Sequence, residues 1–148
     1  MSDKKFLEIY TDGACFGNPG PGGWAAVLIW GDHIKKVSGF EEDTTNNRME
    51  LLAAIKALEA VKNPEVKIQL YTDSQYVKNG ITKWIKTWIH TNWNKGKVKN
   101  VDLWIQLNDL NNKLTVQWHW VKAHNGLHYN EMVDKLAKSM IDNYLGTK

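Results

Sequence analysis

The sequence FLEIYTD (residues 6–12) is an apolar run that ends in Tyr-Thr-Asp, and VKIQLYTD (66–73) ends in the same tripeptide. A short apolar run followed by turn-forming residues predicts a strand in each case. If the two strands lie side by side and parallel, Asp12 and Asp73 emerge at the same sheet edge, where open α/β sheets bind ligands. Two close carboxylates repel each other unless a cation lies between them. The repeat therefore indicates a metal site, although Tyr and Thr are common in strands and Asp is common just after one.

The rest of the chain predicts a mixed α/β domain around these two strands. Gly31-Asp32 separates two apolar stretches and predicts a hairpin, and Thr45 is a suitable N-cap for the first long helix. We expect strands at 5–12, 25–30, 33–42, 66–72 and 115–121, and helices at 46–61, 74–79, 82–89, 101–112 and 129–145. Residues 13–23 and 92–100 are expected to be loops, and Gly80 to separate two short helices. The sum is one domain over residues 1–148, an α/β fold in which helices flank a mixed sheet.

Length and composition exclude several classes of protein. A chain of 148 residues, 43% hydrophobic, can bury one ordinary core. Cys15, the single cysteine, cannot form an internal disulfide or a thiolate zinc site, and it fits a reducing cytoplasm. No stretch approaches the ~20 apolar residues that span a membrane, and no secretory signal precedes the first strand. We therefore expect a cytoplasmic protein without membrane contact. Because no long exposed apolar stripe is evident, we also expect a monomer without an obligate protein partner.

The charge is unevenly distributed along the chain. Residues 74–101 contain six lysines and no acidic residue, although the net charge of the whole chain is only +3. Tryptophans at 84, 88 and 93 are interleaved with these lysines. A basic block with aromatic residues is typical of a surface that binds a polyanion. Alternatively, the tryptophans of an amphipathic helix pack into the core.

Two further acids occupy unusual places on predicted helices. At 100° per residue, Glu50 lies in the middle of the apolar face that Ala54 and Ala57 define. A carboxylate there is unfavourable unless it is paired or hydrogen-bonded, although an acid in the first turn also complements the helix dipole. Asp134 borders the apolar stripe of the last helix, where an ordinary surface pair with Lys138 is the alternative.

The four acids Asp12, Glu50, Asp73 and Asp134 are thus candidates to converge at one sheet edge. Oxygen ligands without a cysteine partner favour Mg²⁺ or Mn²⁺ over zinc. Four carboxylates match a two-metal site that stabilises the attacking and leaving oxygens of a phosphoryl displacement. The basic block would bind the phosphodiester substrate of such a reaction.

These residues resemble the type 1 ribonucleases H, and in particular their bacterial, single-domain members, ribonuclease HI. The blocks that carry the resemblance occur in order across nearly the whole chain: YTDGAC (10–15), TNNRMEL (45–51), YTDSQYV (71–77), VKNVDLW (98–104) and VKAHNG (121–126), followed by Asn130, Glu131 and Asp134. The resemblance implies a ribonuclease H-like fold, with a five-stranded mixed sheet whose first three strands are antiparallel. It also implies hydrolysis of the RNA strand of an RNA–DNA hybrid, which leaves 3′-hydroxyl and 5′-phosphate ends.

The resemblance also implies roles for individual residues. Asp12, Glu50, Asp73 and Asp134 match the family's metal-binding acids, which would hold two Mg²⁺ ions, with Mn²⁺ as a possible substitute. His124 matches a histidine that assists proton transfer or product departure, and an imidazole suits that task because it titrates near neutrality. Ala123 stands where the family usually has glycine. The alanine is expected to stiffen the loop that carries His124.

Substrate contacts follow from the same matching. The 2′-hydroxyls in the shallow minor groove distinguish a hybrid from duplex DNA, and the residues that match the family's groove contacts are Cys15, Asn18, Asn46, Asn47 and Gln75. Turn and cap chemistry would equally explain Asn18 and Asn46. The basic protrusion, residues 78–100, is expected to hold the DNA strand, with Trp84, Trp88, Lys95, Lys97 and Lys99 as its contacts.

Two other classes of function stay open from sequence. A non-catalytic hybrid-binding module could keep the fold and the basic block, but the intact set of four acids argues against it. A nuclease that cuts DNA, such as a junction resolvase or an integrase, could share the fold. Neither the NNRME nor the VKAH block supports this second alternative.

Overall fold

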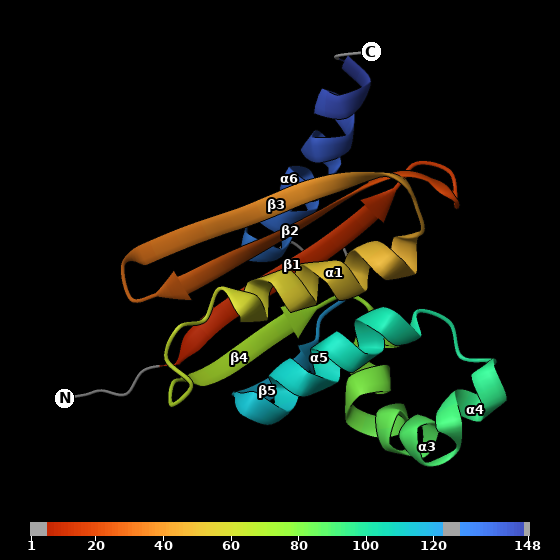
Figure 1. Cartoon of the computed structure of the whole chain (residues 1–148). Coiled ribbons are helices and arrows are strands. Elements are labelled where there is room, and N and C mark those ends of the chain that lie inside the picture. The colour runs from red at the N-terminus through yellow and green to blue at the C-terminus, as the bar shows by residue number, and fades with distance from the viewer. Residues whose placement is uncertain (1–5, 123–127, 147–148) are drawn as a thin grey trace.

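A five-stranded mixed sheet forms the centre of the computed structural model, which describes residues 6–122 and 128–146 (Figure 1). The strand order is β3-β2-β1-β4-β5, with bounds β1 Leu7–Cys15, β2 Gly20–Trp30, β3 His33–Thr44, β4 Lys67–Thr72 and β5 Thr115–Trp120. β1 pairs with β4 in parallel, with Tyr10 opposite Tyr71 and Thr11 opposite Thr72. β2 pairs antiparallel with both β1 and β3. The predicted parallel pair, the hairpin and the antiparallel first three strands are therefore confirmed.

Helices cover the two faces of the sheet, with α1 (Asn46–Glu59) and α5 (Val101–Lys113) on one face and α6 (His128–Gly146) on the other (Figure 1). The Thr45 side chain accepts a hydrogen bond from the Arg48 backbone N–H at 3.3 Å, which confirms the predicted N-cap of α1. The main core lies between the sheet and helices α1 and α5, and it includes Ile9, Leu51, Ile55, Leu70 and Trp104. Among the described residues, no helix is long and apolar enough to span a bilayer.

The prediction of a loop over residues 13–23 is wrong at both ends. β1 continues to Cys15 and β2 begins at Gly20, so that Cys15 pairs with Gly22 and Ala14 with Gly23. A Cβ atom on Gly22 would contact Thr44 and Met49, and one on Gly23 would collide with the backbone of α6. Glycine is needed here because helices approach the strands closely, yet in a sequence it indicates a turn.

The helical run after β4 also differs from the prediction. α2 (Gln75–Asn79), η1 (Gly80–Trp84) and α3 (Ile85–His90) follow one another without a break, and η1 is a π-helical turn. A Cβ atom on Gly80 would overlap the buried indole of Trp104 on α5. Gly80 therefore does not separate two helices. It lies where the continuous helix forms one π turn and passes close to α5.

The predicted loop at 92–100 begins with a short left-handed turn, α4 (Asn92–Gly96). Asn92, Trp93, Asn94 and Lys95 have φ angles between 54° and 59°, and the Lys95 N–H donates to the Thr91 carbonyl at 3.2 Å. Asparagine tolerates this conformation better than most residues because its short side chain hydrogen-bonds locally. Propensity for right-handed helix could not reveal this turn.

Gly80→Ala is predicted to destabilise the protein by about 1–3 kcal/mol, because the new methyl group overpacks against Trp104. Urea unfolding followed by circular dichroism measures the loss as a lower transition midpoint. Gly146→Ala is the matched control, since nothing lies within 4 Å of a Cβ at that position. Equal midpoints for the two variants would contradict the close approach.

Candidate metal centre

Three of the four predicted acids converge where β1 and β4 end. Oxygen atoms of Asp12, Glu50 and Asp73 all lie within 4.8 Å of one another. Asp12 and Asp73 follow the paired residues Thr11 and Thr72, so the parallel register places them side by side. Their predicted convergence is confirmed.

Glu50 reaches this edge because α1 crosses very close to β1. A Cβ atom on Gly13 would lie 2.5 Å from the backbone of both Met49 and Glu50, a separation that real Cβ contacts do not reach. Glycine after Asp12 thus permits the backbone approach that brings a helix carboxylate to a strand carboxylate. The Glu50 residue is only 6% exposed, as expected from its place on the apolar face.

Asp134 enters the same site from α6. It lines, together with the other three acids, a cavity of about 320 Å³. Lys138, one turn further along α6, forms an ion pair with Asp134 at 3.3 Å. The surface pair that was the alternative explanation of Asp134 is therefore present, and it lies at the rim of the acidic cavity.

Burial and mutual repulsion dominate the electrostatics of the site. The pKa of Asp12 is raised to about 8, first by burial and then by the charges of Asp73 and Asp134, although the Gly13 N–H donates to its Oδ1 at 2.9 Å. Burial, followed by the charges of Asp12 and Asp73, also raises the pKa of Glu50 well above its ordinary value. Without a cation, the site is therefore unfavourable for carboxylates that are all ionised.

The residues present fit divalent metal ions. Among the described residues, buried Glu50 Oε1 has no hydrogen-bond partner, and such an orphaned oxygen is costly unless a ligand satisfies it. All the donors in the cluster are carboxylate oxygens, which are the ligands that hard divalent cations prefer. Asp12, Glu50 and Asp73 thus form a group that could hold such an ion, in a cavity that Asp134 also lines.

Two hydrogen bonds at the end of β5 hold the backbone at Thr72 and Asp73 in place. The Trp120 indole N–H donates to the Asp73 carbonyl at 3.0 Å, and the Val121 N–H donates to the Thr72 carbonyl at 2.9 Å. Sequence reasoning gave Trp120 no role at the site. His124 and Ala123 lie outside the described residues, so the predicted role of His124 stays a prediction.

The predicted groove contacts lie around the cavity or beside it. Cys15 and Asn46 line the acidic cavity. Asn18 Oδ1 accepts a hydrogen bond from the Asn46 N–H at 3.0 Å, so both residues perform the turn chemistry that was their alternative explanation. Asn47 lines a second cavity of about 230 Å³ with Trp88 and Lys99, and Gln75 is exposed at the start of α2.

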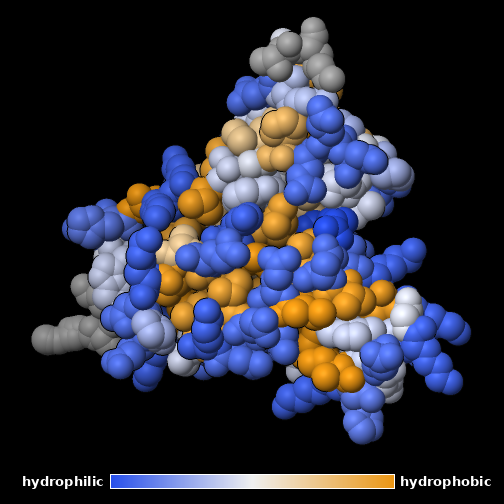
Figure 2. Space-filling model, viewed as in Figure 1, coloured by the Kyte–Doolittle hydropathy of each residue, from blue (hydrophilic) through white to orange (hydrophobic). Residues whose placement is uncertain are grey.

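The tryptophans of the basic segment form one chain of rings. Trp88 is half-buried and contacts Trp104 of the core at a centroid distance of 5.2 Å, Trp84 at 5.8 Å and Trp93 at 6.3 Å. Trp84 is 42% exposed, so it offers a free aromatic surface while Trp88 anchors the segment. Lys95, Lys97 and Lys99 are exposed, and hydrophilic side chains extend from this protrusion into solvent (Figure 2).

Sequence reasoning missed one residue of the acidic cavity and one long-range contact. Phe16 lines the acidic cavity and is 41% exposed. Its position directly after Cys15, a predicted site residue, could have indicated this place. Arg48 pairs with both carboxylate oxygens of Asp102, at 3.1 and 3.0 Å, and donates to Asn100 Oδ1 at 3.1 Å. No local pattern predicts a contact over this distance along the chain.

Comparisons with known proteins agree with this geometry. A sequence model of the RNase H family matches residues 4–142. A Ribonuclease H from Hahella chejuensis is 54% identical over 145 residues, which cover 96% of this chain and 97% of that protein.

Solved structures are similar as well. LC9-RNase H1, described as a type 1 RNase H with the type 2 active-site motif, is 30% identical with a TM-score of 0.84 and covers 96% of this chain and 75% of that chain. LC11-RNase H1, solved in complex with RNA/DNA hybrid, is 22% identical with a TM-score of 0.73 and covers 94% of this chain and 99% of that chain. At this identity the second likeness shows the fold alone.

Asp12→Asn is predicted to raise the melting temperature of the metal-free protein at pH 8, by about 5 °C or more, and to have less effect at pH 4. The folded pKa of Asp12, about 8, exceeds the ordinary 3.8. Wild-type protein therefore loses stability as the pH rises from about 4 to about 8. In this range Asp12 is ionised in the unfolded chain but still protonated in the folded chain. The variant lacks this loss.

Differential scanning calorimetry in chelator, at pH values from 4 to 8, measures the difference between variant and wild type. Added Mg²⁺ should raise the wild-type melting temperature at pH 8 and have little effect on the variant. A difference that stays constant across this pH range would contradict the electrostatic account.

Proposed function

The chain belongs to the ribonuclease H family, and from this membership we propose that it is an endoribonuclease that hydrolyses the RNA strand of RNA–DNA hybrids. The products carry 3′-hydroxyl and 5′-phosphate ends. The observation that supports this function most directly is the convergence of Asp12, Glu50 and Asp73 within 4.8 Å, in a cavity that Asp134 also lines. The full set of acids argues against a module that binds hybrids without cutting them.

The metal ions are proposed to be two Mg²⁺, with Mn²⁺ as a substitute, because the site offers carboxylate oxygens alone. When bound, they stabilise charge on the attacking and leaving oxygens of the phosphoryl displacement. Asp12, 3% exposed, and the unpartnered oxygen of Glu50 supply ligands from the buried side of the cavity. Asp73 and Asp134, which are less buried, supply ligands from its open side.

His124 is proposed to move a proton between the reacting oxygens and solvent. An imidazole suits this task because its ordinary pKa lies near neutrality. The residue lies outside the described part of the chain, so the proposal depends on its matching the family's VK-x-H block. Ala123 would restrict the backbone of that block more than glycine does.

The hybrid is proposed to be recognised through its minor groove by Cys15, Asn18, Asn46, Asn47 and Gln75. Amide side chains donate to and accept from 2′-hydroxyls and base edges. Asn46 lines the acidic cavity and Asn47, the next residue, lines the neighbouring one. A groove that crosses the start of α1 would therefore meet both amides, which supports this arrangement.

The DNA strand is proposed to lie along the basic protrusion. Lys95, Lys97 and Lys99 are exposed and carry the charge that neutralises phosphates. The exposed face of Trp84 and the half-buried ring of Trp88 provide aromatic surface against deoxyribose or a base. Since acids and lysines belong to one chain, we propose that a cytoplasmic monomer of one domain performs the whole reaction.

Asp12→Asn is predicted to lower kcat by about a thousandfold or more, because several kcal/mol of transition-state stabilisation depend on the metal site. Hybrid affinity, measured by fluorescence anisotropy, should change little. Asp109→Asn is the matched control, since Asp109 is exposed on α5. The assay uses labelled RNA–DNA hybrid, duplex DNA and duplex RNA, each with Mg²⁺ or with chelator. Cleavage in chelator, or DNA cut as fast as hybrid RNA, would refute the proposed function.

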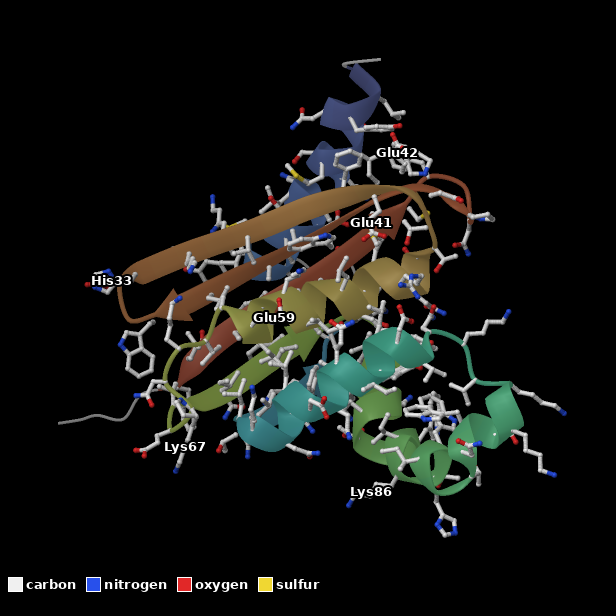
Figure 3. The ribbon with its side chains drawn as sticks, viewed as in Figure 1. His33, Glu41, Glu42, Glu59, Lys67 and Lys86 are labelled. Atoms are coloured by element: carbon white, nitrogen blue, oxygen red, sulfur yellow. The ribbon has the colours of Figure 1, made fainter. Side chains whose placement is uncertain are left out.

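Replacing Lys95, Lys97 and Lys99 together by Ala is predicted to raise KM for the hybrid about tenfold at moderate salt. It should also reduce the slope of log KM against log salt by about 1 for each lost phosphate contact. Alanine replacements at Lys35, Lys36 and Lys67 remove the same charge elsewhere; in Figure 3, Lys67 lies at the start of β4, away from the protrusion that carries Lys86. A control with the same loss would contradict a local role for the protrusion.

A further inference from the structure

In the described part of the chain, one half of the sheet has no helix over it on the side of α6. α6 packs against β1, β2 and β3, so β4 and β5 lie beyond the area that it covers (Figure 1). On this uncovered face Lys67, Thr115 and Gln117 are exposed. A row of rings occupies the boundary between the covered and the uncovered halves.

The row consists of His119, Tyr71, Tyr10 and Tyr129, which we name the ring stack. Tyr10 and Tyr71 are stacked with a centroid distance of 4.7 Å and an interplanar angle of 13°, and Tyr71 and His119 with 4.9 Å and 20°. These three residues are direct cross-strand partners on β1, β4 and β5. Tyr129 continues the row from the first turn of α6, with its ring 5.5 Å from that of Tyr10.

The outer end of the ring stack is fixed by amide contacts. The His119 Nε2 atom contacts Gln69 Oε1, and the Gln69 amide donates to Gln117 Oε1 at 2.6 Å. Gln69 therefore holds the His119 ring, and Gln117 in turn holds Gln69. Rings that are stacked and bounded in this way keep adjacent strands at a fixed separation.

The ring stack lies directly before the acids. Side chains alternate between faces along a strand, so Tyr10 precedes Asp12 on one face of β1, and Tyr71 stands in the same relation to Asp73. Pairing between β1 and β4 ends at Thr11 and Thr72, one residue short of the two carboxylates. Tyr10 and Tyr71 are therefore the last pair of side chains on this face before the carboxylates.

We propose that the ring stack is a positioning element for the metal site, which sets the spacing of Asp12, Asp73 and Asp134. It joins the three elements that carry or precede these acids, because Tyr10 lies on β1, Tyr71 on β4 and Tyr129 on α6. None of its rings lines the acidic cavity, so the ring stack acts through the acids rather than on substrate. The inference rests on the proposed metal role of the acids.

Tyr71→Leu tests the proposal, because leucine keeps apolar bulk and removes the stacked ring. Calorimetric titration of the metal-free full chain with Mn²⁺ measures the dissociation constant. We expect it to rise about three- to tenfold, the range that corresponds to one or two lost aromatic contacts. KM for the hybrid at saturating Mn²⁺ should stay as in wild type. Tyr71→Phe, which keeps the ring, should bind Mn²⁺ with wild-type affinity.

Ile68→Val is the control for stability alone, because Ile68 is buried on β4 in the core on the opposite face. It should lower the melting temperature and leave the Mn²⁺ dissociation constant unchanged. Tyr129→Leu is the second variant, to be used for the same titration if Tyr71→Leu does not fold. Wild-type Mn²⁺ affinity in the folded leucine variant, or an equal loss in Ile68→Val, would overturn the proposal.

Asp12→Asn separates this proposal from the proposed function. If this variant binds Mn²⁺ as wild type does, the metal role of the acids fails, and the ring stack proposal fails with it. If Asp12→Asn loses Mn²⁺ binding while Tyr71→Leu keeps it, only the ring stack proposal fails.

Discussion

Repulsion between buried carboxylates is the constraint on which the rest of this structure depends. Parallel pairing of β1 with β4 brings Asp12 beside Asp73, and the absence of a side chain on Gly13 lets Glu50 join them. Burial, followed by the charges of Asp73 and Asp134, raises the pKa of Asp12 to about 8, because the ionised form is unfavourable there. A divalent ion bound between the carboxylates would offset this repulsion.

The fold was predictable wherever a local signal agreed with the tertiary structure. The two YTD strands, the Thr45 cap and the hairpin at Gly31 each have a short-range signature, and each is found. The misjudged segments share one cause. Gly22, Gly23 and Gly80 are required by helices that approach from elsewhere in the chain, and a glycine required by a distant neighbour is locally the same as a glycine in a turn.

The residues of the site also differ in whether a local sequence signal could predict them. Glu50 could be predicted as a site residue because a carboxylate on the apolar face of a helix is unfavourable unless it has a partner. This signal is present in the sequence of the helix itself. Tyr10 and Tyr71 are ordinary residues for a strand, since tyrosine is common there. The sequence therefore predicted two strand residues but gave no sign of the ring stack. Its existence depends on the register of β4 with both β1 and β5, which emerges only when the whole sheet has formed.

The contact between Arg48 and Asp102 shows how the acidic and basic parts of the molecule are joined. Asp102 is 61% exposed at its side chain, so an ion pair here contributes little to stability. Its geometry is nevertheless specific, because Arg48 binds both carboxylate oxygens and also Asn100. Arg48 is one half-turn from Glu50, and Asn100 follows Lys99 of the protrusion. The pair therefore links α1, which carries Glu50, to the end of the basic protrusion.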